Sequence, residues 1–409
     1  MQITAKPTPW YYTPTIILLA GCLVAIVNFG VRSTFGQFTL PISEAHGWPR
    51  ETYSLAIALQ NLLWGVATPI AGALADRYGS ARVLMVGAVL YAIGIVMMNN
   101  AGSPAMLHLG GGVVVGIGIA LSSFGIVMAA LGRIVPPERR SWAFGLATAS
   151  GSLGQFIFSP FVGALIAAYD WHTSLLVLAA SSLLIIPFAF PLLAQNSSSA
   201  TATAGETSLS MGKAVSKAFG HGSYNLLVAG FFVCGFQLAF ITVHLPPYLA
   251  QHGMTKEFAG IAMALIGLFN VAGSYASGII GGRGDKRVPL SAIYLARAVV
   301  TAAYIMLPIT PASTLVFTAC MGFLWLSTVP LTMGLITVMF GTRYMGTLYG
   351  FVFLSHQIGS FFGVWLGGKL FDIYGSYNIV WWMSIGLAVF AALINLPIKE
   401  QRAASFSAA

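Results

Sequence analysis

The chain has 409 residues, of which 57% are hydrophobic and 7% are charged, and its formal net charge is +9. Charged side chains make up about a quarter of an ordinary soluble protein, so this composition excludes a water-soluble globule. It indicates an all-α protein that crosses a lipid bilayer many times.

Twelve apolar runs are long enough to cross a hydrocarbon core of about 30 Å. Six lie at about 14–40, 52–75, 82–99, 105–132, 141–168 and 172–194, and six more at about 225–250, 258–281, 289–308, 313–340, 346–368 and 376–397. The first run lacks a small-residue cleavage site and is expected to remain in the protein. The stretch between the two sets is rich in Ser, Thr and Ala and is typical of a flexible linker. Within it, the residues from Lys213 to Lys217 could form a short surface helix. We therefore expect bundles at 1–194 and 223–409, joined by a cytoplasmic linker at 195–222.

The basic residues are distributed unevenly between the two sides of the predicted bundle. The loops that follow odd-numbered runs contain only Arg50, Lys256 and Lys369. The loops that follow even-numbered runs, together with the tails, contain Lys6, Arg77, Arg82, Arg133, Arg139, Arg140, Lys213, Lys217, Arg283, Lys286, Arg287, Arg343, Lys399 and Arg402. This positive-inside bias places both termini in the cytoplasm, and it explains the net charge without a nucleic-acid partner.

A short charged hairpin, Gly72 to Arg82, separates the second and third runs. Gly72 is expected to let two helices approach closely, and Gly79 to permit a tight reversal. Asp76, Arg77 and Arg82 offer an ion-paired latch at the membrane surface. The segment resembles the loop between the second and third helices of the major facilitator superfamily of transporters; a solvated turn between two spans is the alternative.

An internal repeat supports that resemblance. An offset of 206 residues pairs Glu51, Gly72 and Arg77 with Glu257, Gly278 and Arg283. In the second copy Gly282 and Asp285 replace Asp76 and Gly79, so only the first hairpin keeps the full latch. Two parallel repeats of six helices are the architecture that the superfamily implies. Its members alternate access by rocking one half against the other.

The start of the fifth run carries a second pattern, in which Arg139 and Arg140 precede Ala143, Gly145, Ala147 and Gly151. It resembles the corresponding segment of monocarboxylate transporters and of the oxalate:formate antiporter group. The resemblance implies secondary transport of a small organic anion, with a monocarboxylate as the leading candidate.

Ionisable side chains inside the runs are the best candidates for the site, because a charge in hydrocarbon costs at least ~2.5 kcal/mol. Arg32 lies roughly 13 Å below the end of the first run. It could hold a carboxylate through a two-pronged hydrogen bond, or could instead bind carbonyls of a broken helix. His356 lies near the centre of the eleventh run and could donate to an anion or take a proton.

Further polar residues are expected to shape a pocket between Arg32 and His356. They are Gln37, Gln155, Gln237, Asn270, Trp325 and Gln357. Each could instead form a hydrogen bond between helices. His244 shares a helical face with Gln237 and is the second candidate for a proton carrier, with a surface-facing structural histidine as the alternative. Arg297 is expected to be peripheral, where it would snorkel or brace the second hairpin.

The family patterns are not complete in this chain. As the resemblance implies, oxalate:formate antiporters carry a lysine at the place of His356 and an arginine at that of Ser274. The aspartate and arginine of the monocarboxylate transporters fall at Asn270 and Ser274. We therefore do not expect oxalate as the substrate, nor that family's coupling arrangement.

The ten acidic residues all lie at loops or at the ends of runs. This argues against proton coupling through a buried carboxylate and against a cation exporter. The three cysteines are scattered among apolar runs, and no metal site, phosphate-binding loop or partnered nucleophile is visible. We expect no cofactor and no enzymatic activity.

Together these observations predict a multi-pass transporter of the cytoplasmic membrane that moves a small organic anion, with or without a proton, and needs only a monomer. Efflux of neutral or amphipathic compounds is the main alternative. Ser159-Pro160-Phe161-Val162-Gly163 partly matches the pattern of drug antiporters in the fifth helix. A membrane sensor or an intramembrane enzyme is a weaker alternative. Substrate, direction and coupling mode stay open.

Overall fold

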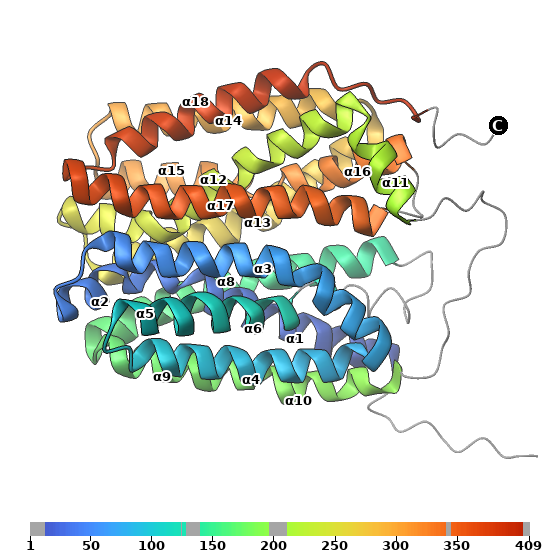
Figure 1. Cartoon of the computed structure of the whole chain (residues 1–409). Coiled ribbons are helices and arrows are strands. Elements are labelled where there is room, and N and C mark those ends of the chain that lie inside the picture. The colour runs from blue at the N-terminus through green and yellow to red at the C-terminus, as the bar shows by residue number, and fades with distance from the viewer. Residues whose placement is uncertain (1–12, 124, 128–139, 196–210, 341–344, 404–409) are drawn as a thin grey trace, which may run out of the picture.

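The structure is a computed structural model that describes residues 13–123, 125–127, 140–195, 211–340 and 345–403. Every regular element in these ranges is a helix, and they include 11 spans long and apolar enough to cross a membrane. A twelfth helix, α17 (Met345–Tyr374), has 30 residues and runs beside the others (Figure 1). It carries buried His356, Gln357 and Ser360. The prediction of an all-α membrane protein with twelve spans is confirmed.

In the first half the first span is broken: α1 (Pro14–Ser33) is followed by the short helices η2 (Phe35–Phe38) and α2 (Thr39–His46). The span therefore ends six residues later than the apolar run indicated. The remaining elements are α3 (Arg50–Tyr78), α4 (Ser80–Asn99), α5 (Pro104–Leu107), the π-helical η3 (His108–Val114), α6 (Val115–Leu121), α8 (Arg140–Ala168), α9 (Trp171–Leu183), α10 (Ile185–Ala189) and η5 (Phe190–Gln195).

The second half begins with a short helix, α11 (Met211–Phe219), which includes the Lys213–Lys217 stretch. The tenth span is broken near Trp325, between α15 and α16. The other elements are α12 (Gly222–Gln251), α13 (Lys256–Arg283), α14 (Arg287–Met306), α15 (Pro311–Leu324), α16 (Thr328–Phe340) and α18 (Asn378–Asn395).

Local sequence explains where many helices begin and turn. The side chains of Thr13, Ser103, Asp170, Thr255 and Thr310 each accept a hydrogen bond from an amide in the first turn of the helix that follows. Such N-caps satisfy amide groups that the helix itself leaves unpaired. Gly47 and Gly79 have φ angles of 63° and 90°, a region that favours glycine, and they end α2 and α3.

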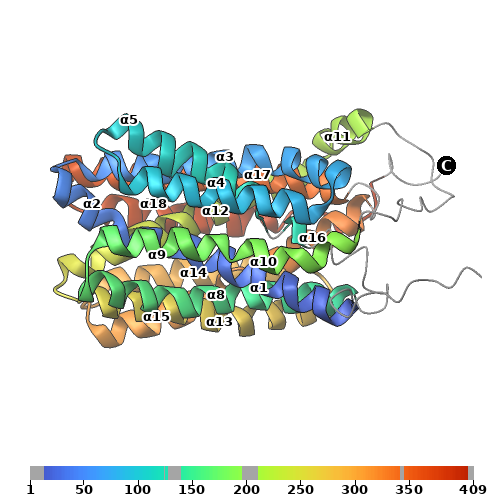
Figure 2. The same ribbon diagram turned by 90° about the horizontal axis from the view of Figure 1, so that it is seen from below.

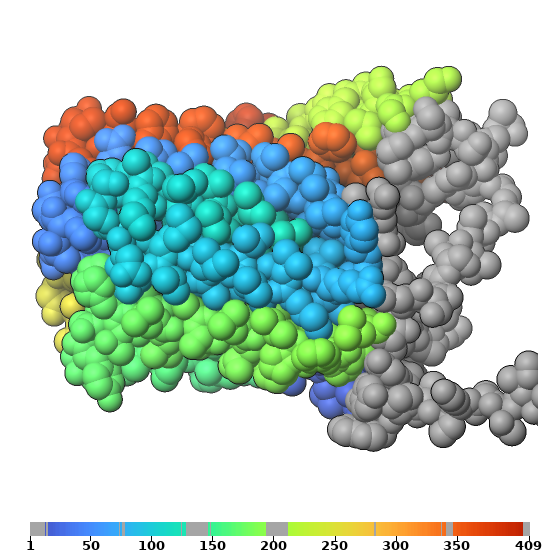
Figure 3. Space-filling model, turned by 60° about the horizontal axis from the view of Figure 1, so that its bottom comes forward, coloured from blue at the N-terminus to red at the C-terminus, as the bar shows by residue number. Residues whose placement is uncertain are grey.

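The long helices run side by side along one axis, with α1 to α10 on one side and α12 to α18 on the other (Figure 1). We call the end where α1 begins and α18 ends the terminal end, and the end where α2 stops and α3 begins the far end. Helix α11 lies at the terminal end in the view from below as well (Figure 2). The space-filling view shows residues 80–121 and 171–195 packed closely along one face of the first half (Figure 3).

Two hydrophobic cores fill the two halves. One consists almost entirely of residues between Ile17 and Leu192, and the other of residues between Ala214 and Ala403. Ala239, Val243 and Val364 of the second half pack into the first core. The halves therefore contact one another through apolar side chains as well as through the polar contacts described below.

Glycines allow the halves to approach at backbone distance. A Cβ atom on Gly36 of η2 would lie 2.1 Å from the Thr242 carbonyl oxygen of α12, and one on Gly260 of α13 would lie 2.7 Å from that of Ser159 in α8. Either distance is a steric clash, so these positions need glycine. At Gly72, by contrast, an added Cβ would meet no atom of the described chain within 4 Å. Close helix packing at Gly72 therefore stays a prediction.

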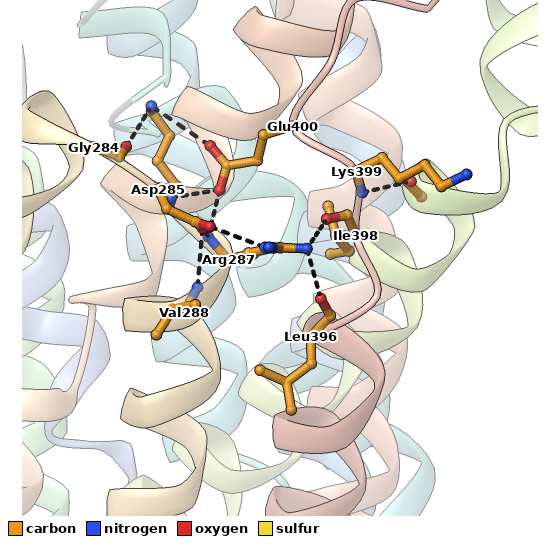
Figure 4. A network of polar contacts seen from close by, with 10 residues as sticks. Gly284, Asp285, Arg287, Val288, Leu396, Ile398, Lys399 and Glu400 are labelled. Carbon is orange, nitrogen blue, oxygen red and sulfur yellow. Dashed lines mark hydrogen bonds and ion pairs between the residues drawn. The ribbon is translucent and has the colours of Figure 1, made fainter.

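A segment after α18 folds across the terminal end of the second half (Figure 4). The Glu400 carboxylate accepts hydrogen bonds from the backbone amides of Lys286 and Arg287 at the start of α14. The Arg287 guanidinium donates to the Leu396 and Ile398 carbonyls and to Asp285. We call residues 396–403 the C-terminal strap.

Candidate functional site

A small cavity lies where the two halves meet. Arg32, Phe35, Gln60 and Asn61 line it from the first half, and Thr242 is among the residues that line it from α12 of the second. It forms because α1 ends at Ser33, directly after Arg32, and the chain continues as the short helix η2. Of the residues predicted for the pocket, only Arg32 lines this cavity.

The Arg32 side chain is partly exposed to the cavity and has no hydrogen-bond or ion-pair partner in the described chain. Its guanidinium lies 4.5 Å from the centroid of the Trp64 ring and 5.9 Å from that of Phe29. Cation–π contacts of this kind hold a guanidinium in place without using its N–H groups. Its five donors therefore stay free, and a carboxylate can accept two of them in a planar fork.

His356 lies on α17 and is 7% exposed. Its Nδ1 is 2.9 Å from the Gln357 Oε1, which accepts the hydrogen bond, while Gln357 Nε2 donates across to the Asn61 carbonyl at 3.1 Å. Asn61 lines the central cavity, so Gln357 joins His356 to the cavity wall.

A line of aromatic rings connects the two basic residues across the halves. The Trp64 ring meets the Phe353 ring edge to face at 5.1 Å, and Phe353 stacks on His356 at 5.7 Å with an interplanar angle of 9°. Trp64 was missed at the sequence level. It lies four and three residues after Gln60 and Asn61, so helical periodicity places it near the same face.

Gln155 and Asn270 tie the halves together at the contact between α8 and α13. Gln155 Nε2 donates to the Met263 carbonyl at 3.1 Å, and Asn270 Nδ2 donates to the Ser152 hydroxyl at 2.9 Å. The Asn270 Oδ1 accepts from the Leu326 amide. These are the helix-to-helix hydrogen bonds that were the alternative to a ligand contact.

Gln237 and Trp325 lie inside the second half, around Arg297. The Arg297 guanidinium is fully buried and donates to the carbonyls of Leu324 and Trp325, and also to the Gln237 Oε1. Gln237 Nε2 donates to Ser384. The expectation of a peripheral Arg297 is wrong, because the break between α15 and α16 exposes carbonyls that a buried guanidinium can satisfy.

His244 is fully buried, so the surface-facing alternative is wrong. Its Nε2 donates to the Val364 carbonyl at 2.7 Å, and a Cβ added to Gly367 would lie only 2.3 Å from the same nitrogen. This packing leaves Nε2 no room for another partner.

Gln37 lines a separate small cavity between η2, α2, α12 and α13, together with Pro41, Pro246 and Lys256. Its Nε2 donates to the Ser159 carbonyl at 2.9 Å, while its buried Oε1 has no partner in the described chain. The structure thus separates Gln37 from the Arg32 cavity, because the break after Arg32 turns the two side chains toward different spaces.

The expected latch is described only in part. Gly79 makes the turn from α3 into α4, and the Arg82 side chain is exposed. The side chains of Asp76, Arg77 and Arg283 lie outside the described part of the structure. The ion-paired latch stays a prediction.

Known proteins resemble this chain over most of its length. The model of the Major Facilitator Superfamily matches residues 21–364. Monocarboxylate transporter 13 of Rattus norvegicus is 26% identical over 93% of this chain and 88% of its own length. An uncharacterized MFS-type transporter of Bacillus subtilis (strain 168), YcxA, is 23% identical over 93% and 94%.

Two solved structures share the fold. One is a bacterial homolog of the human lysosomal transporter Spinster in an inward-facing and occupied conformation, with a TM-score of 0.77, 15% identity, and coverage of 95% of this chain and 97% of that one. The other is the nucleoside transporter NupG, with a TM-score of 0.74, 14% identity, and coverage of 93% and 99%. At these identities the likeness concerns the fold alone.

Proposed function

This chain belongs to the Major Facilitator Superfamily, and on that premise we propose that it is a secondary transporter of a small organic anion, with a monocarboxylate as the favoured substrate. The observation that carries the proposal is the Arg32 guanidinium, which faces the cavity between the halves with its hydrogen-bond donors free. A fixed, partly desolvated cation recognises an anion and discriminates against neutral compounds.

Polar groups at the wall of the Arg32 cavity support a polar, charged substrate. Gln60 and Asn61 line this wall together with Arg32. These groups favour a carboxylate over the amphipathic compounds of the efflux alternative.

We assign any coupled proton to His356 rather than to His244. His356 is joined to the cavity wall through Gln357, while His244 is enclosed by Gly367 and bonded to Val364. The described spans carry no carboxylate at the Arg32 cavity, so the substrate itself supplies the negative charge opposite Arg32.

We further propose that the terminal end faces the cytoplasm and that the far end, where the halves are joined, faces outside. The excess of Lys and Arg in the loops of the terminal end supports this orientation. The two halves then rock about the cavity, and Asp76, Arg77 and Arg82 latch the cytoplasmic side when the outside is open.

The test is a thermal-shift screen of the purified protein with short carboxylates, followed by flux in proteoliposomes. A carboxylate that binds the folded state raises the Tm, and this shift should vanish in Arg32→Gln but persist in Lys213→Gln, whose exposed lysine lies on α11 at the terminal end. Stabilisation by neutral aromatic compounds alone would instead favour efflux.

A further inference from the structure

Helix α3 starts without a cap from its own half. It begins at Arg50, directly after Pro49, and Pro49 supplies no side-chain hydrogen bond to the first turn. The first amides of a helix have no partner within the helix, so they need a side chain or water. Here the Asp372 carboxylate supplies both bonds: Oδ1 accepts from the Arg50 amide at 3.1 Å and Oδ2 from the Glu51 amide at 2.6 Å.

Asp372 belongs to the other half of the protein, near the end of α17. Its partners Arg50 and Glu51 are 322 and 321 residues away in the sequence. The cap therefore exists only while the far ends of α3 and α17 are together. A carboxylate also interacts favourably with the partial positive charge of a helix N-terminus.

The internal repeat provides a comparison within the same molecule. The residue 206 positions after Pro49 is Thr255, and its hydroxyl accepts from the Phe258 amide at 3.2 Å to cap α13. Helix α13 is thus capped within its own half, and α3 is not. The fifth and eleventh spans pair at an offset of 205 residues, as Gly154 and Gly359 do, and this places Ala167, which has no group that could cap a helix, opposite Asp372. Of the two repeat-related helices α3 and α13, only α3 is capped by a residue of the other half.

Other contacts reinforce the same junction. Trp365 Nε1 donates to Glu51 Oε1 at 3.0 Å, and Lys369 Nζ lies 3.7 Å from that oxygen. Trp365, Lys369 and Asp372 are spaced so that they share one face of α17. The Arg50 guanidinium lies 3.7 Å from the Phe371 ring centroid and donates to the Tyr377 hydroxyl. The first turn of α3 is thus held almost entirely by the other half.

We propose that Asp372 is the gating residue of the far end, and that it closes this end by capping α3 across the two halves. Opening transfers the Arg50 and Glu51 amides from the carboxylate to water, whereas α13 keeps its own cap throughout. The junction of α3 with α17 therefore sets the equilibrium between closed and open far ends. This inference concerns only the rocking of the halves, so it holds whatever the substrate is.

The experiment measures the distance between the halves at the far end, with spin labels on Gly102→Cys and Ala312→Cys. Both positions are exposed, they lie in different halves, and a Cβ added to Gly102 meets open space. The exposed Cys320 is replaced by Ser, while Cys22 and Cys234 are buried. No substrate is added, so the result does not depend on the proposed function.

We expect Asp372→Ala to raise the ratio of open to closed populations about fivefold, the size expected for a lost cap. The matched control is Asp170→Ala. Asp170 caps α9 at the same end of the molecule, but within its own half, and its loss should leave the ratio unchanged. An unchanged distance distribution in Asp372→Ala would overturn the proposal.

Pro49→Ser separates capping from a simple loss of charge, because it gives α3 the kind of cap that Thr255 gives α13. In the Pro49→Ser background, Asp372→Ala should change the ratio less than about twofold. An equal effect in both backgrounds would show that Asp372 acts by some means other than capping. Circular dichroism and the Tm of each variant confirm that the labelled protein is folded.

Discussion

The Arg32 guanidinium lies 4.5 Å from the centroid of the Trp64 ring, and Trp64 Nε1 has no hydrogen-bond partner in the described chain. The arginine is thus positioned by a ring face rather than by a carboxylate. An ion pair would neutralise the charge that the substrate needs, whereas a ring face leaves the donors free. The relationship leads directly to two predictions about binding.

Replacing Arg32 should remove most carboxylate binding. Hydrogen bonds to charged groups contribute about 1.5–3 kcal/mol each, so Arg32→Gln should raise the Kd by about 10- to 100-fold. Arg32→Lys keeps the charge but loses the planar fork and should fall between Arg32→Gln and the wild type. Isothermal titration with the carboxylate found in the thermal-shift screen measures both, and wild-type affinity in Arg32→Gln would disprove the assignment.

Trp64 should act through Arg32 rather than on its own. A cation–π contact contributes about 0.5–2 kcal/mol, so Trp64→Leu should weaken carboxylate binding by about 2- to 30-fold. Trp64→Phe keeps a ring face and should lose less. In the Arg32→Gln background Trp64→Leu should have almost no further effect, because the contact is already gone. Additive losses in the double variant would indicate direct contact of Trp64 with the substrate.

Gly36 and Gly72 should respond differently to alanine. A Cβ at Gly36 would lie 2.1 Å from the Thr242 carbonyl oxygen, while one at Gly72 meets no described atom within 4 Å. Forced overpacking costs typically about 1–3 kcal/mol, so Gly36→Ala should lower the Tm clearly and Gly72→Ala hardly at all. Fluorescence-monitored unfolding of both variants in one detergent makes the comparison. Equal losses would contradict the described packing.

Attachment of the C-terminal strap should depend on pH through Asp285 and Glu400. Burial and the hydrogen bond with Asp285 raise the pKa of Glu400 above its ordinary 4.5. The bond from Glu400 and that from Arg287 lower the pKa of Asp285 below its ordinary 3.8. Folding thus favours the protonated form of Glu400 and the ionised form of Asp285, so attachment of the strap shown in Figure 4 is strongest between these two pKa values.

The direction of this pH dependence follows from the linkage between proton binding and stability. Glu400 has a raised pKa, so its contribution is present at acidic pH and is lost as the pH rises through that pKa. Asp285 has a lowered pKa, so its contribution is lost only at still lower pH. Amide exchange in residues 396–403, corrected for its intrinsic pH dependence, should therefore show more protection at mildly acidic than at neutral pH. Glu400→Gln, which can always donate, should remove the difference; a persistent difference would assign it to other groups.

Much of the fold could be predicted from the amino-acid sequence. Apolar runs are legible because hydrocarbon imposes length and composition on each span locally. The run at 258–281, for example, became α13 (Lys256–Arg283) with its ends displaced by two residues. Runs with internal breaks were predicted less well, because the break after Arg32 and that near Trp325 depend on contacts with other helices rather than on apolar length.

The candidate site was less predictable. The sequence by itself determined that Arg32 and His356 are basic residues deep in apolar spans, since that is a matter of position along a helix. Only the tertiary structure decided that Arg32 faces the cavity between the halves. Arg297 lies in an equally apolar span, but its guanidinium is enclosed and donates to the carbonyls of Leu324 and Trp325. It likewise decided that Asp372, 322 residues from Arg50, caps α3. Helical periodicity specifies which residues share a face, but which partner that face meets depends on how the two halves pack.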